Sequence, residues 1–370
     1  MTLRRYIIAT MVLAGAVVAQ AQVQLRSYET IFGRAKLVKN ACHHGAKYNQ
    51  VDRNNIRLVA ENLLRFQNAD GGWPKGIDWL DTAPVDSILS YLPEKQKISV
   101  LDGKNVCMQL EYMSQAFTQF QDERFKTSAL RSLDYLLAAQ MPNGGWKGND
   151  INAICFNSNI MSSVLKTLYL ISNGMSPYQW MPRSNRSKAK KAYEKGIDVA
   201  LKCQIRMPDG TLAGWCQQHD NETFLPTKGR SYEHPCISAA ETAMMTSMMM
   251  SIAQPDAKIK EAVVGAMTWL ESAARSGIKI VNIPASDSLQ AITHKKIDRE
   301  LVKDPESKRI WARCYSLDKN EIFFSDKNGT IKYDFNSVEP DRRINYAWFG
   351  YWPEGSMILY RTWKIKHNVK

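Results

Sequence analysis

The sequence predicts an all-α fold in which paired helices repeat around an axis. Three observations lead to this prediction: a segment that recurs at long intervals, apolar residues at helical spacing within each copy, and strand signals confined to short stretches such as 278–283 and 330–333. We expect a closed toroid rather than an open solenoid, because the repeat is long and the ends lack polar capping repeats.

Each copy of the repeat is a helix that ends near a Gln and leads into a turn with Gly and Trp. The copies occupy 63–73, 136–146 and, more loosely, 200–215, and a fourth without its glycines ends at 270. In a toroid these turns gather at one end. Two of the tryptophans are expected to pack at their turns, whereas Trp73, which Pro74 and Lys75 follow, is the better candidate for a platform that contacts a ligand.

The individual helices follow from the spacing of apolar residues. Leu130, Leu133 and Leu137 form one stripe in a helix expected at 125–140, and Pro142 ends that helix. The same reasoning predicts further helices at 55–67, 105–120, 159–172, 189–204 and 239–251.

The N-terminus carries the pattern of a secretory signal peptide. Arg4 and Arg5 precede an apolar run over 6–18, which is too short to span a bilayer, and a small-x-small cleavage site follows at 19–21. We therefore expect residues 1–21 to be a signal peptide, residues 22–370 to form a single domain, and the protein to be secreted or periplasmic, with no membrane span.

Charge and cysteine content narrow the class of partner. The formal net charge is +13, from 49 Lys and Arg against 36 Asp and Glu. For an exported protein this charge favours an acidic polymer outside the cytoplasm over nucleic acid, although a basic surface can also serve solubility alone. The seven cysteines are widely spaced and form no zinc or disulfide pattern, so buried free thiols are expected. We expect a monomer.

Four blocks of sequence stand out in order along the chain. They are NADGGWPK at 68–75, the strings GWCQQHD and PTKGRSYE within 214–233, the strings WARCYSL and NGTIKY within 311–333, and RRINYAWFGYWP at 342–353. Together these blocks resemble the pectate lyases of polysaccharide lyase family 10. The resemblance implies an incomplete (α/α)3 toroid that binds polygalacturonate or pectic oligosaccharides in a groove. It also implies cleavage by β-elimination, with calcium between protein acids and the sugar carboxylate.

The resemblance also implies roles for individual residues. Arg230 matches the Arg that removes the proton from C5 of the uronate, Asp102 matches an acid on the metal side, and Arg313 is expected to face the substrate. Further residues expected to bind substrate are Trp73, Lys75, Lys104 and Asp220.

The chemistry is reasonable for these residue types, with one difficulty. The C5 proton becomes acidic only when a cation withdraws charge from the adjacent carboxylate. An Arg side chain, with an ordinary pKa of about 12.5 or more, is a weak candidate for a base unless other cations lower that pKa or the medium is alkaline. From composition alone, a salt bridge between Arg230 and Glu233 or Asp220 is an equal alternative.

The sequence departs from the family pattern at the metal side. Ser158 occupies the place of a second family acid, and Lys104 follows Asp102 where the family has small residues. Three readings follow: calcium binds more weakly through Asp102, Asn157 or Asn159 with waters, Lys104 neutralises the sugar carboxylate instead, or catalysis has lapsed and the groove only binds.

Two other classes of function stay open. Helical toroids also host glycoside hydrolases, which need two carboxylates about 5 to 10 Å apart, and Asp220, Glu233 and Glu241 are candidates. A non-enzymatic protein that binds acidic polysaccharide would keep Trp73 and Arg313 and release no product.

Overall fold

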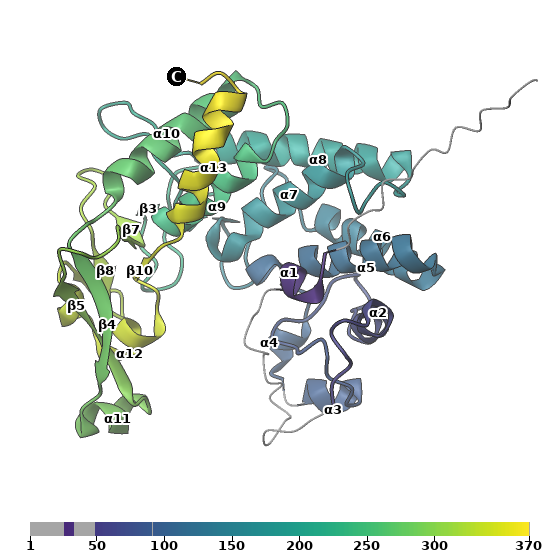
Figure 1. Ribbon diagram of the computed structural model, residues 1–370, viewed down its shortest axis with the longest axis horizontal. Coiled ribbons are helices and arrows are strands. Elements are labelled where there is room, and N and C mark those ends of the chain that lie inside the picture. Colours follow the sequence, from purple (N-terminus) through teal and green to yellow (C-terminus); the bar gives the residue numbers. More distant parts are fainter. Residues whose placement is uncertain (1–25, 33–48, 91, 370) are drawn as a thin grey trace, which may run out of the picture.

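The computed structural model describes residues 26–32, 49–90 and 92–369, so the expected signal peptide lies outside the described residues. Helices form most of the body, and a two-stranded arm projects from it (Figure 1). Within the described ranges, no helix is both long enough and apolar enough to cross a bilayer.

Two layers of helices carry the fold. The outer layer consists of α2 (Ile56–Arg65), α6 (Glu123–Ala138), α8 (Arg183–Lys202) and α10 (Ala257–Ala273). The inner layer consists of α5 (Cys107–Phe120), α7 (Ile160–Ser172), α9 (Ala239–Met250) and α13 (Pro353–Lys366). Inner helices pack on their outer partners, α5 on α6, α7 on α8 and α9 on α10, and α7 contacts both α5 and α9. The arrangement is that of an α/α toroid, as the sequence predicted.

A shared set of hydrogen bonds accounts for the sequence repeat. In each copy the Trp indole N–H donates to a carbonyl of the preceding outer helix: Trp73 to Leu63, Trp146 to Leu136, Trp215 to Ala200 and Trp311 to Leu270. The Gln at each helix end donates both to its turn and to the next outer helix, as Gln67 does to Gly71 and Ser128. The fourth repeat thus keeps its Trp as Trp311, far along the chain from α10.

The first glycine of the turn is required by close packing. Gly71 has a φ of 93° and Gly144 a φ of 99°, in the region that L side chains rarely adopt. A Cβ on Gly71 would also lie 2.3 Å from the carbonyl oxygen of Arg131 in α6. The repeat therefore allows the turn to contact the next outer helix directly.

Strands are short and peripheral, apart from the arm. The arm pairs β4 (Ile278–Pro284) with β5 (Ile297–Lys303) in an antiparallel hairpin, with α11 (Asp287–Thr293) at its tip (Figure 1). The two-residue strands are β1 (Ile154–Cys155), β2 (Gln218–His219), β3 (Ile237–Ser238), β6 (Trp311–Ala312), β7 (Cys314–Tyr315), β8 (Phe324–Ser325), β9 (Ile331–Lys332) and β10 (Phe349–Gly350).

The remaining elements are short helices in the loops. They are α1 (Tyr28–Phe32), α3 (Val85–Ser90), α4 (Glu94–Lys97), α12 (Pro340–Asn345) and the 3-10 turns η1 (Asp102–Lys104), η2 (Asn157–Asn159) and η3 (Phe335–Ser337). The six cysteines of the described residues are buried and free, as expected, and Cys42 lies outside these residues.

Candidate active site

Two strained turns, η1 and η2, lie against each other at the start of the inner helices α5 and α7. Four residues in them have a positive φ: Gly103 (69°), Lys104 (69°), Ser158 (54°) and Asn159 (62°). A residue other than glycine pays roughly 1–2 kcal/mol for this conformation, and such strain concentrates at functional sites.

Asn105 fixes the position of the first turn. Its buried side chain donates to the carbonyl oxygens of Trp73, at 2.8 Å, and Val100, at 2.9 Å, and accepts a 2.7 Å hydrogen bond from Gln109. These bonds hold η1 against the segment that carries Lys75. As a result the Lys75 ammonium lies 3.0 Å from a carboxylate oxygen of Asp102.

A small cavity of about 20 Å³ lies beside the two turns. It brings together Asp102, Ser158 and Arg230, which the sequence analysis placed at one site from three distant parts of the chain. Asn157, considered above as a calcium ligand, also lines it, as does Asp150, which was not among the expected site residues. The volume is sufficient for a single water or ion and is too small to enclose a sugar unit.

Arg230 is held on both sides by carboxylates. Its Nη1 donates to Glu233 at 2.8 Å and its Nη2 to Asp150 at 3.0 Å. Glu233 is buried, with 1% of its side chain exposed, whereas Asp150 is 54% exposed. Partial burial acts to lower the pKa of Arg230, but the two carboxylates outweigh burial and the pKa is raised above its usual range. In this state the guanidinium is charged.

Glu233 is itself fixed by a network of donors. Asn157 and Gln218 donate to its two oxygens, each at 3.2 Å, and the backbone N–H of Arg230 donates at 3.1 Å. A Cβ on Gly229 would lie 2.4 Å from Glu233, which explains the glycine before Arg230. Because Glu233 has no room to move, it orients Arg230 toward the cavity. Asp150 is exposed, so it is the carboxylate that a ligand can displace from Arg230.

Three of the expected substrate-binding residues lie elsewhere. Trp73 is fully buried in the core, so the prediction of a ligand platform was wrong: its ring packs under the turn and its indole N–H is used there. Asp220 caps a local turn by accepting from the backbone N–H groups of Glu222 and Thr223. Lys104 lines a second, larger cavity and not the small one.

Arg313 does not join Arg230 at the small cavity. Its side chain is 13% exposed and lies 3.2 Å from the buried carboxylate of Glu241. The guanidinium also lies over the rings of Tyr346 and Trp352, at 5.1 and 4.8 Å. Arg313 therefore packs among Glu241, Tyr346 and Trp352.

The cavity offers oxygen ligands for calcium, but the negative charge of its carboxylates is largely neutralised by neighbouring cations. Asp102 and Asp150 supply carboxylates and Asn157 and Ser158 supply neutral oxygens, which are the ligand types that calcium prefers. Each carboxylate already faces a cation, Lys75 or Arg230. Among the described residues, no three acidic, His or Cys side chains are grouped as metal ligands. The donor set fits an ion that shares its coordination with water and substrate.

The carboxylates considered for glycoside hydrolysis are engaged in other contacts. Glu233 holds Arg230, Glu241 pairs with Arg313 and accepts from Ser238, and Asp220 caps its turn. Of the three, only Glu233 lies next to the small cavity, and it is buried beneath Arg230.

Comparison with known proteins places the fold. The family model described as pectic acid lyase matches residues 67–357. A variant of a family 10 polysaccharide lyase from Cellvibrio cellulosa, solved in complex with trigalacturonic acid, superposes with a TM-score of 0.69 at 22% identity, covering 92% of this chain and 99% of that one. A second structure of a family 10 lyase from the same organism gives a TM-score of 0.68 at 24% identity, covering 89% and 95%. No curated protein sequence matches the chain.

Proposed function

Because the chain belongs to the pectic acid lyase family, we propose that it cleaves polygalacturonate by β-elimination at the small cavity beside η1 and η2. The observation that carries this proposal is the position of Arg230, which buried Glu233 orients toward a cavity that Asp102 also lines. The solved relative with bound trigalacturonic acid supports the class of substrate.

In the proposed reaction, a uronate unit displaces Asp150 and lies against Arg230. A neutral guanidine nitrogen of Arg230 takes the proton from C5, the C5–H electron pair forms the C4–C5 double bond, and the bond from C4 to the glycosidic oxygen breaks. The leaving oxygen takes a proton from water, and the guanidinium later returns its proton to solvent. Lys75, at the rim of the cavity beside Asp102, is placed to offset negative charge on the uronate carboxylate.

Calcium has a defined place in this proposal. Asp102 and Asp150 would hold the ion, and when bound it would withdraw charge from the uronate carboxylate and make the C5 proton more acidic. Because Ser158 adds no charge and Lys75 competes for Asp102, the protein alone should hold calcium weakly. The Lys75 ammonium can offset negative charge on the uronate carboxylate whether or not the ion is present.

We propose that the protein acts outside the cytoplasm as a monomer. The signal-peptide pattern of residues 1–21 supports export, and pectic polymers are too large to enter a cell intact. The basic net charge would raise the local concentration of such a polyanion at the surface.

A matched pair of variants tests the proposal. Arg230→Lys keeps a positive charge but removes the guanidine, and Arg183→Lys makes the same change at the start of α8, outside the cavity. We expect Arg230→Lys to lower kcat/KM on polygalacturonate by about 100-fold or more, and Arg183→Lys to leave it unchanged. The raised pKa of Arg230 favours the competing proposal, a protein that only binds pectic chains. Binding without product from the unaltered protein, at any pH, would establish that competitor.

A further inference from the structure

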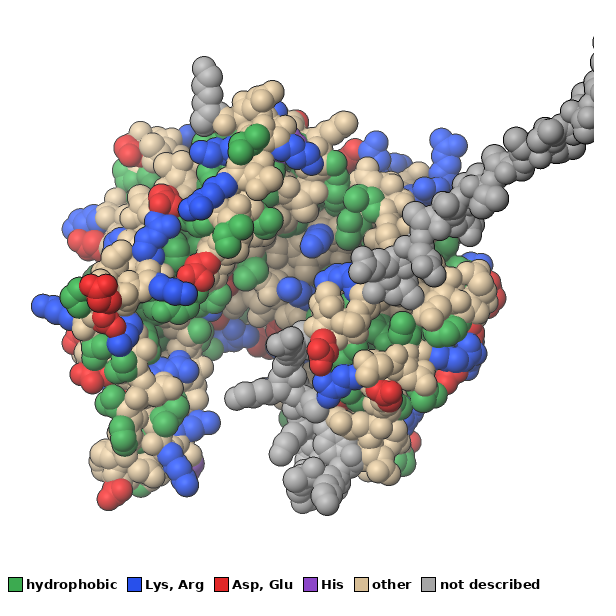
Figure 2. Space-filling view, viewed as in Figure 1, with side chains coloured by type: hydrophobic (Ala, Val, Ile, Leu, Met, Phe, Trp, Pro, Cys, Tyr) green, Lys and Arg blue, Asp and Glu red, His purple; other side chains and the backbone are tan. Residues whose placement is uncertain are grey.

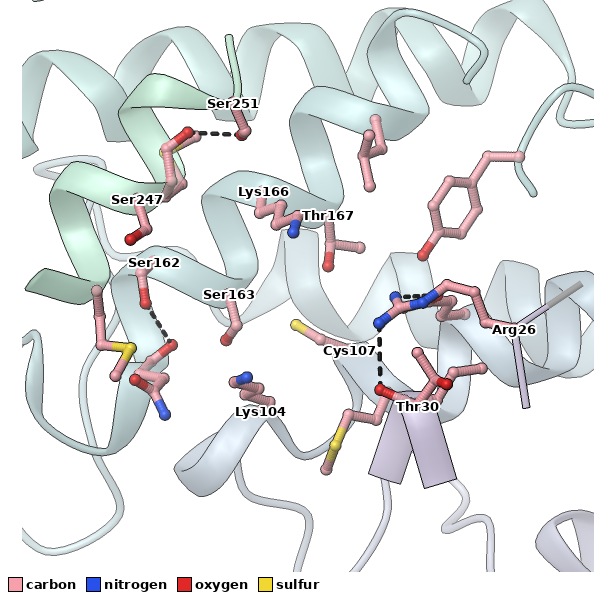
Figure 3. Close-up of a pocket in the computed structure, with 18 of the residues that line it drawn as sticks. Arg26, Thr30, Lys104, Cys107, Ser162, Ser163, Lys166, Thr167, Ser247 and Ser251 are labelled. Carbon is pink, nitrogen blue, oxygen red and sulfur yellow. Dashed lines mark hydrogen bonds and ion pairs between the residues drawn. The ribbon is translucent and has the colours of Figure 1, made fainter. Parts of the chain in front are cut away.

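A second cavity of about 340 Å³ is also lined by residues of η1 and η2, Lys104 and Asn159. The inner helices α5, α7 and α9 form most of its wall, with α1 at one end. Figure 2 shows the hollow on this face of the molecule, with basic side chains in its depth. In Figure 3, Lys104 and Lys166 point into the same space from η1 and α7.

The two lysines supply positive charge that is not paired with a carboxylate within the described part of the chain. Among the described residues, neither ammonium forms a hydrogen bond or an ion pair, whereas Arg26, the third cation of the cavity, is paired with Glu111. Burial lowers the pKa of Lys166, the positive charges of Arg26 and Lys104 lower it further, and the carboxylate of Glu111 acts in the opposite direction. Three cations with one carboxylate leave the cavity with a net positive charge, which an anion would satisfy.

Small hydroxyl side chains form the rest of the polar lining. Ser163 and Thr167 lie one turn apart on α7, and Ser247 lies on α9 one turn before Ser251, the residue that follows the end of that helix. Each pair faces the same cavity (Figure 3). Several of these hydroxyls donate to carbonyls of their own helices, as Ser163 does to Ile160, so their oxygens remain to accept from a ligand. Inner helices of a packed ring would ordinarily carry larger apolar residues here. The lining suits a molecule with both hydroxyl and anionic groups.

The same two turns connect this cavity with the candidate active site. Asp102 and Ser158 line the small cavity, and Lys104 and Asn159, in the same turns, line the large one. Because the same two turns line both cavities, a polymer bound at Arg230 lies close to the large cavity.

We propose that the large cavity is a subsite for a second uronate unit of the same acidic oligosaccharide, and that Lys104 and Lys166 bind its carboxylate. The proposal rests on the proposed function for the substrate class. In this proposal the two lysines bind a part of the substrate that lies away from the cleaved bond. Removing either lysine should therefore weaken binding and raise KM while leaving kcat unchanged, because the contact is the same in the ground state and the transition state.

The test is calorimetric titration of the full-length mature protein with hexagalacturonate at pH 6, where cleavage that needs a neutral Arg230 is slow. Lys166→Gln and Lys104→Gln are compared with Lys188→Gln, which removes an exposed lysine of the outer helix α8. We expect affinity to fall about tenfold for each cavity variant and to stay unchanged for Lys188→Gln. Lys166→Arg should restore most of the affinity, which a merely structural effect of the substitution would not predict.

The outcomes separate this subsite from the proposed function. Hexagalacturonate that binds and is cleaved, with equal affinity for the unaltered protein and both cavity variants, would overturn the subsite and leave the lyase proposal standing. Binding that depends on the two lysines, with no cleavage of hexagalacturonate in a parallel assay at alkaline pH, would support the subsite and overturn the lyase proposal. No binding to the unaltered protein would overturn both. Circular dichroism of each variant verifies that it is folded.

Discussion

Glu233 holds Arg230 through two contacts, one to the side chain at 2.8 Å and one to the backbone N–H at 3.1 Å. The carboxylate is buried, and Asn157 and Gln218 fill its remaining acceptor positions. This relationship fixes which edge of the guanidinium faces the cavity. It also keeps the guanidinium charged, so the contact that orients Arg230 also lowers the fraction of it that is neutral and able to accept a proton.

Replacing Glu233 with Gln tests its positioning role. The variant keeps the shape but places an amide N–H₂ against donors, so we expect a loss of about 1–3 kcal/mol in the free energy of unfolding, measured by urea denaturation. Loss of the negative charge should also lower the pKa of Arg230 and move the alkaline rise in activity toward lower pH. An unshifted pH profile in a folded variant would show that Glu233 does not control Arg230.

The pH dependence of activity follows from the raised pKa of Arg230. A base whose pKa lies above the assay range is neutral in a fraction that grows tenfold with each pH unit. We therefore expect log kcat/KM to rise with a slope of about 1 and to show no plateau below about pH 10. Initial rates on polygalacturonate across this range measure the slope, and a plateau near neutral pH would assign the base to another group.

Ser158→Asp should restore charge at the metal side. Ser158 has a φ of 54°, a conformation that Asp and Asn tolerate, so Ser158→Asn is a control that changes shape without charge. We expect the Asp variant to bind calcium about tenfold more tightly than the Asn variant in a calorimetric titration without substrate. Equal affinities would mean that this position does not reach the ion.

His219 should make stability depend on pH. Burial lowers its pKa to about 4, and in its neutral form it accepts from the N–H of Cys216 while the other ring nitrogen donates to the carbonyl of Phe224. The unfolded chain binds a proton near pH 6.5, so the free energy of unfolding falls as pH drops from 6.5 toward 4. At pH 5 the loss is about 2 kcal/mol relative to pH 7.

Urea denaturation at the two pH values measures this loss. In His219→Gln the part of the pH dependence that comes from the histidine should disappear. If the folded variant keeps the full dependence on pH, another group is responsible.

Trp73→Phe should affect stability and not binding. The ring is buried and its indole N–H donates to Leu63, so the variant loses a hydrogen bond and some packing, about 1–2 kcal/mol. Affinity for hexagalacturonate should stay within twofold of the unaltered protein. A large loss of affinity at unchanged stability would show that Trp73 contacts the ligand.

The sequence predicts the helical repeat well because one local pattern carries it. The Gln and Gly-Gly-Trp positions make the same hydrogen bonds in successive copies, so their recurrence in the sequence indicates a repeated structural unit. The fourth copy was harder to recognise, since its tryptophan, Trp311, is separated from α10 by the arm. The helix α8 begins at Arg183, before its first apolar stripe, so it starts earlier than apolar spacing predicted.

The site is only partly predictable, because it depends on long-range placement. The resemblance located Arg230, Asp102 and Ser158, which do line one cavity. Asp150 pairs with Arg230 across 80 positions in the sequence, and no local pattern indicates that contact. Lys104 has a positive φ, which the sequence does not reveal at a lysine, and it lines the larger cavity and not the small one.

The most direct test of the account is the product of the unaltered protein acting on polygalacturonate at alkaline pH. β-Elimination leaves a C4–C5 double bond, so we predict that ultraviolet absorbance of the products rises in step with the number of new reducing ends, and that Arg230→Lys abolishes both. New reducing ends without the absorbance would identify hydrolysis and contradict elimination at Arg230.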